Sequence, residues 1–128
     1  MTGPHATIWL RYGARMDRET ALRRLYAAFN ARDIDTTLAG MTADVDWPNG
    51  WEGGYVKGHD EVRAYWTRQW EEVDSTAEPL AFSTRPDGRV EVRVHLVGRT
   101  PAGELLFDHE GSHVYTFQGD LVGHMSIE

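Results

Sequence analysis

The chain has 128 residues, of which 13 are basic and 20 are acidic, so its formal net charge at pH 7 is −7. The length suits one domain with its own hydrophobic core, and the acidic balance disfavours nucleic acid and membranes as partners, because both require a basic surface. The chain has no cysteine, which excludes disulfides and thiolate sites and makes the cytoplasm the location that we expect.

Residues 1–16 precede the periodic part of the sequence. Their only apolar run, around Ile8–Leu10, is short and broken, so the sequence predicts neither a signal peptide nor a transmembrane span there. We interpret residues 1–16 either as an extension before a natural start at Met16, rather than Met1, or as an arm packed on the body. Residues 17–128 are expected to form a single domain.

Three amphipathic helices are predicted from apolar residues that recur at helical spacing. Each has a polar residue at its start that suits helix capping. The first spans about residues 17–31, the second about 34–41 behind Asp33, and the third about 60–73 behind His59 or Asp60.

Strands are indicated by period-two alternation and by the turn formers between them. Short strands are expected at Val45–Trp47 and Tyr55–Lys57, and a four-stranded antiparallel meander is expected after Ser75. A hairpin is predicted at Asp87-Gly88, and a two-residue turn at Gly119-Asp120 would form another. The order predicts an α+β fold, in which three helices pack on one face of a curved, mainly antiparallel sheet.

The last hairpin carries the strongest functional signal. With a two-residue turn at its tip, Tyr115 would lie opposite His124 and Phe117 opposite Val122, so that these four residues share one face with His113. That face is apolar near the turn and titratable further along, as in a small-molecule pocket. We therefore predict that it forms a pocket wall.

His113, His124 and Tyr115 are the candidate catalytic residues, with His113 or His124 as an acid or base and Tyr115 as an orienting group. Each competes with a purely structural role, because buried histidines and strand tyrosines are common. Trp51, in a glycine-rich loop, is interpreted as a lid over the pocket mouth. The residues expected to contact a ligand are Tyr26, Trp47, Trp51, Trp66, Phe117 and Val122.

A metal site is not expected despite the six histidines. His109 and His113 lie four residues apart on one predicted strand, about 13 Å at ~3.4 Å per residue, which is too far to share one ion. His113 and His124 have no third ligand in a suitable position. No glycine-rich phosphate loop is present, so we expect no metal and no cofactor.

The chain resembles the nuclear transport factor 2-like superfamily, especially its SnoaL-like polyketide cyclase and ketosteroid isomerase branches. The resemblance rests on the run Leu25–Asp35, the run Met41–Trp47, Gly58 before a helix, and Phe117–His124. It covers residues 17–128. It implies a cone-shaped α+β barrel with an interior pocket, commonly in a homodimer built on the outer sheet face.

The resemblance does not carry the ketosteroid isomerase site over intact. The positions that match its tyrosine, its general-base aspartate and its protonated acid are occupied by Leu25, Trp47 and His113, so that isomerase reaction is disfavoured. The SnoaL-like cyclases place an aspartate acid/base on the later strands, where His113 is the nearest match. Because the ordinary pKa of histidine is about 6.5, His113 could transfer protons near neutral pH.

Two classes of function remain open. The first is a cofactor-free enzyme of the cyclase or isomerase kind that acts on a carbonyl compound, and the second is a non-catalytic binding or scaffold protein for a small apolar ligand. We expect a homodimer through the outer sheet face, which would bear Arg93, His95, Val114 and Met125.

Overall fold

Three helices and six strands make up the part of the chain that the structure, a computed structural model, describes, namely residues 18–128. The interpretations of residues 1–16 and of a start at Met16 concern residues outside this range, as does residue 17, where the first helix was predicted to begin. The first helix spans residues 18–30. The other elements are α2 (Ile34–Ala39), α3 (Gly58–Glu72), β1 (Met41–Pro48), β2 (Tyr55–Lys57), β3 (Asp74–Thr84), β4 (Val90–Arg99), β5 (Leu105–Gln118) and β6 (Leu121–Ile127).

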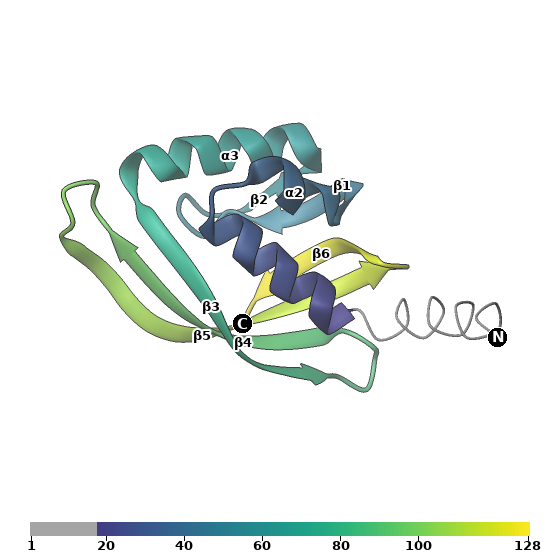
Figure 1. Cartoon of the computed structure of the whole chain (residues 1–128). Coiled ribbons are helices and arrows are strands. Elements are labelled where there is room, and N and C mark those ends of the chain that lie inside the picture. Colours follow the sequence, from purple (N-terminus) through teal and green to yellow (C-terminus); the bar gives the residue numbers. More distant parts are fainter. Residues whose placement is uncertain (1–17) are drawn as a thin grey trace, which may run out of the picture.

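The six strands form one sheet in the order β2-β1-β6-β5-β4-β3. β3 to β6 are the predicted antiparallel meander, whereas β1 runs parallel to β6. The predicted α+β class is confirmed, and the sheet is strongly curved but not closed, with β2 and β3 as its edges (Figure 1).

Helix starts follow the local chemistry of the sequence. Asp33 caps α2 and accepts a hydrogen bond from the Thr36 backbone N–H at 3.2 Å. α3 begins at Gly58, earlier than predicted, and its N-cap is Lys57 rather than His59 or Asp60. Gly58 permits this because its φ of 80° is the left-handed conformation that glycine adopts without strain.

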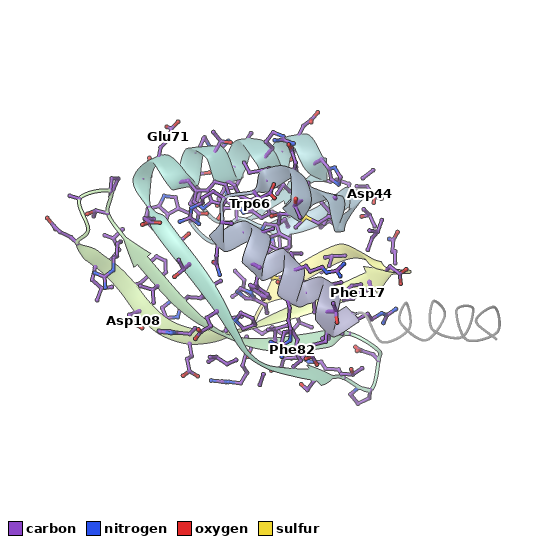
Figure 2. The ribbon with its side chains drawn as sticks, viewed as in Figure 1. Asp44, Trp66, Glu71, Phe82, Asp108 and Phe117 are labelled. Carbon is purple, nitrogen blue, oxygen red and sulfur yellow. The ribbon has the colours of Figure 1, made fainter. Side chains whose placement is uncertain are left out.

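The first helix and α3 lie on the concave side of the sheet (Figure 1). The core between the layers includes Leu22, Val62, Trp66, Val92 and Val94, all of which are at most 1% exposed. Figure 2 shows Trp66 between α3 and the sheet. The helices thus roof the concave face, and aromatic side chains fill much of the space beneath them.

No helix within residues 18–128 is long and apolar enough to span a membrane.

Candidate functional site

A cavity of about 390 Å³ lies between the helices and the concave face of the sheet. Its wall is mostly aromatic and apolar. Among the residues that the structure describes, no Asp, Glu, Lys or Arg lines it. The aromatic wall residues are Tyr26, Phe29, Trp47, Trp51, Tyr65, Trp66, Phe107 and Tyr115, and the polar ones are Gln69, Ser75, Thr76, His109 and His113.

Three of these side chains form a chain of hydrogen bonds. The hydroxyl of Tyr115 donates to the hydroxyl of Tyr26 at 2.7 Å, and the hydroxyl of Tyr26 lies 2.8 Å from Nδ1 of His113. The Tyr26 and His113 rings are also stacked, with centroids 6.1 Å apart. Exposures of 0%, 3% and 7% for Tyr115, Tyr26 and His113 show that bulk water does not compete for these bonds.

The first helix is fixed over β3 by Asn30. Its side chain accepts from the Ala77 backbone N–H and donates to the Ala77 carbonyl, both at 2.9 Å. Because Tyr26 lies one helical turn before Asn30, this pair of bonds sets the height at which Tyr26 meets His113. The alternation of β5 places His113 and Tyr115 on the same face.

Burial determines the charge state of the hydrogen-bonded chain. Desolvation lowers the pKa of His113 to about 4, because the imidazolium ion loses its hydration in the apolar wall. Desolvation also raises the pKa of Tyr26 and of Tyr115 well above the ordinary tyrosine value. All three groups are therefore uncharged at neutral pH, and burial moves the pKa of His113 below the ordinary histidine value on which its expected proton transfer was based.

Trp51 lies at the edge of the cavity on the loop between β1 and β2. It is 40% exposed, and its indole N–H donates to a carboxylate oxygen of Glu72 on α3 at 2.9 Å. The side chain of Asn49 holds the loop through hydrogen bonds from the backbone N–H groups of Trp51 and Glu52. Trp51 is thus held at the cavity wall by contacts with Asn49 and Glu72.

The expectation that His124 shares the pocket face with His113 is wrong. β6 contains a bulge at Gly123, so that Thr116 pairs with His124, whereas Phe117 still pairs with Val122. One extra residue moves every later side chain of β6 to the opposite face. His124 is consequently half-exposed on the outer face, where its ring stacks on Tyr55 with centroids 5.3 Å apart.

Three other expectations are corrected, and only the first of them, for Met125, follows from this shift. Met125, predicted on the outer face, pairs with Tyr115 and lines the cavity. Phe117 and Val122, predicted to contact a ligand, belong to the core beside the cavity and do not line it. Phe117 instead packs under the guanidinium of Arg18, at 5.0 Å from its ring centroid.

The model of the SnoaL-like domain matches residues 22–125. The chain belongs to the SnoaL-like domain family. No curated protein sequence matches it significantly.

Solved structures similar to this SnoaL-like domain share its fold at low identity. One is an NTF2-like protein from Burkholderia pseudomallei, at 23% identity and a TM-score of 0.76 over 88% of this chain and 89% of that one. Another is TerC, co-crystallised with polyporic acid, at 24% identity and a TM-score of 0.75 over 87% of this chain and 89% of that one. A third is Rv0760c from Mycobacterium tuberculosis, in complex with estradiol-17β-hemisuccinate, at 18% identity and a TM-score of 0.71 over 84% of this chain and 89% of that one.

Several wall residues of the SnoaL-like domain were not expected from the sequence. His109 and Phe107 lie two and three alternations before His113 on β5, so strand parity alone could have placed them. Tyr65 and Gln69 lie on the apolar stripe of α3 or at its border. Ser75 gave no signal, and its hydroxyl is buried at the cavity wall without a hydrogen-bond partner in the described part of the chain.

Within residues 18–128, no group of three His, Asp or Glu side chains is arranged to hold a metal ion.

Proposed function

We propose that this SnoaL-like domain binds an uncharged, ring-containing small molecule that carries a carbonyl oxygen. We further propose that it performs cofactor-free acid/base chemistry of the cyclase or isomerase type on that carbonyl. His113 is the group that contacts the oxygen, and Trp47, Trp66 and Tyr26 form the walls that hold the rings.

The observation that carries this proposal is the placement of His113. It is a buried, hydrogen-bonded imidazole in a wall that is otherwise mostly aromatic. A few fixed polar groups in an apolar cavity are typical of sites that orient a small ligand. A hydrogen bond from such a group to a developing oxyanion is strong in a dry, low-dielectric site.

Two similar structures support the ring-containing, oxygen-bearing part of this ligand class. TerC was crystallised with polyporic acid and Rv0760c with an estradiol derivative. Both molecules contain several rings and oxygen substituents. A cavity of about 390 Å³ falls in the range of small-molecule sites.

Non-catalytic binding is the second candidate, and one observation favours it. The cavity wall has no carboxylate among the described residues, and the pKa of His113 near 4 makes its imidazole a weak base at neutral pH. A pocket without an effective base would hold its ligand without transforming it.

The test is a screen of aromatic ketones, with binding followed by tryptophan fluorescence and product formation followed by chromatography. His113→Asn should reduce turnover by about 10²-fold or more, because positioned acid/base groups contribute this much, and it should change affinity little. Trp47→Ala should weaken affinity instead. His124→Asn, on the opposite face of the sheet, is the matched control and should change neither. Binding without turnover in wild type would favour the second candidate.

We also propose a homodimer in the cytoplasm, with the outer sheet face as the interface. Arg93 and His95 lie on that face with their side chains partly exposed, whereas Val114 is already buried within the single chain. His95 hydrogen-bonds to Asp108 of β5 at 2.6 Å, and Figure 2 shows Asp108 on that strand. A monomer by light scattering at micromolar concentration would refute the dimer.

A further inference from the structure

The proton of the Tyr115 hydroxyl has a single acceptor. Tyr115 is fully buried, and within residues 18–128 its only hydrogen-bond partner is Tyr26. If Tyr115 accepted from Tyr26 instead, its own proton would be left unpaired in the core. An unpaired buried donor is disfavoured by a factor of roughly 5 to 150, so Tyr115 donates.

The direction of the first bond fixes the second. The oxygen of Tyr26 accepts from Tyr115, and its own proton then points to Nδ1 of His113 at 2.8 Å. Nδ1 must accept, so it carries no proton. Since burial keeps the imidazole neutral above about pH 4, the single ring proton lies on Nε2.

The Nε2–H group is the free end of this chain. Nε2 has no hydrogen-bond partner among the described residues, and His113 lines the cavity. A ligand that enters the cavity therefore meets an N–H donor at this position and no lone pair of the imidazole. The cavity wall offers no charged side chain that could neutralise an ionic ligand, because no Asp, Glu, Lys or Arg lines it among the described residues.

We propose that Tyr26 and Tyr115 are positioning residues that hold His113 as a neutral Nε2–H donor, and that the cavity therefore selects an uncharged ligand with an acceptor oxygen, such as a ketone or a quinone. This inference rests on the proposed function and narrows it. In the proposed acid/base chemistry, His113 therefore acts on the carbonyl oxygen as a hydrogen-bond donor.

The tautomer is measured by NMR of the full chain labelled with ¹⁵N-histidine. His113→Asn identifies the His113 signals by their loss. At pH 7 we expect a neutral ring with the proton on Nε2, and a proton on Nδ1 would overturn the proposal without any ligand or further variant. Tyr26→Phe removes the donor to Nδ1 and should raise the fraction of the Nδ1–H form.

Tyr65→Phe is the matched control for the spectrum. Tyr65 is a buried tyrosine that lines the same cavity, and it does not hydrogen-bond to His113. Its substitution should leave the His113 tautomer unchanged. If Tyr26→Phe also leaves it unchanged, or if Tyr65→Phe alters it as strongly, Tyr26 has no specific positioning role.

The ligand class is tested with two isosteric probes, 2-acetylnaphthalene and 2-isopropenylnaphthalene, which differ only in the C=O and C=CH₂ groups. For each protein we divide the affinity for 2-acetylnaphthalene by the affinity for 2-isopropenylnaphthalene. This ratio should be about fivefold larger for wild type than for Tyr26→Phe, because one hydrogen bond contributes about that factor. An equal ratio, with the Nε2–H form established in wild type, would overturn the selection of acceptor oxygens. If neither probe binds to wild type, the proposed function and the ligand class fail together, while the spectrum still decides the role of Tyr26.

Discussion

Acidification should destabilise this domain through His113. The ordinary pKa of histidine, 6.5, applies to the unfolded chain, whereas burial lowers the pKa of His113 to about 4 in the folded chain. Between these values the unfolded chain binds a proton that the folded chain does not, so falling pH favours unfolding. At about 1.4 kcal/mol per pKa unit, the loss reaches about 3 kcal/mol. The full stability is present above pH 6.5 and is lost as the pH approaches 4.

The assay is urea unfolding of wild type and His113→Asn in steps from pH 7.5 to pH 4. Asparagine does not titrate, and its amide oxygen can replace Nδ1 as the acceptor for Tyr26. The difference in unfolding free energy between the two proteins should shift by about 3 kcal/mol in favour of the variant as the pH falls. His95, whose pKa is raised by its hydrogen bond to Asp108, titrates in both proteins and cancels. A difference that stays constant would show that His113 is not desolvated as described.

Three further changes test the frame of the site by urea unfolding. Asn30→Ala should lower the free energy of unfolding by about 1–3 kcal/mol, because it leaves the buried backbone groups of Ala77 unpaired. Unchanged stability would contradict the role of Asn30 in fixing the first helix over β3. Ser75→Ala should raise stability by about 1–3 kcal/mol, because it removes a buried hydroxyl that has no partner among the described residues; a loss of stability would reveal an unrecognised bond. Gly98→Ala would place a methyl group in steric conflict with the Phe107 ring and should cost about 1–3 kcal/mol. The cost should fall when Phe107→Leu is added.

The architecture was predictable because its signals are local. The turn at Asp87-Gly88 forms as predicted, and the Arg85 backbone N–H donates to the Arg89 carbonyl at 2.7 Å across it. The alternation of apolar residues in β4 and the apolar stripe of α3 both arise because one face of each element packs on the core and must be apolar. Local signals of this kind identify elements and the faces that they bury.

Positions on one strand were also predictable. His113 and Tyr115 are two residues apart on β5, so they share a face whatever strand pairs beside them. His124 was placed by its expected partner across the hairpin, and a single unpaired glycine, Gly123, moved it to the other face. The bulge leaves no periodic signal in the sequence, because β6 is only seven residues long and alternates imperfectly.

The contact between Tyr26 and His113 shows why the chemistry of the site needed the structure. These residues are 87 positions apart, and no periodicity relates a helix near the start of the chain to a strand near its end. The resemblance to ketosteroid isomerases matched their tyrosine to Leu25, and one helical residue turns a side chain by about 100°. Yet the phenol of Tyr26 reaches His113 from the next position. The pKa of His113 then follows from this burial and not from its residue type, so the donor character of His113 is a property of the packed cavity as a whole.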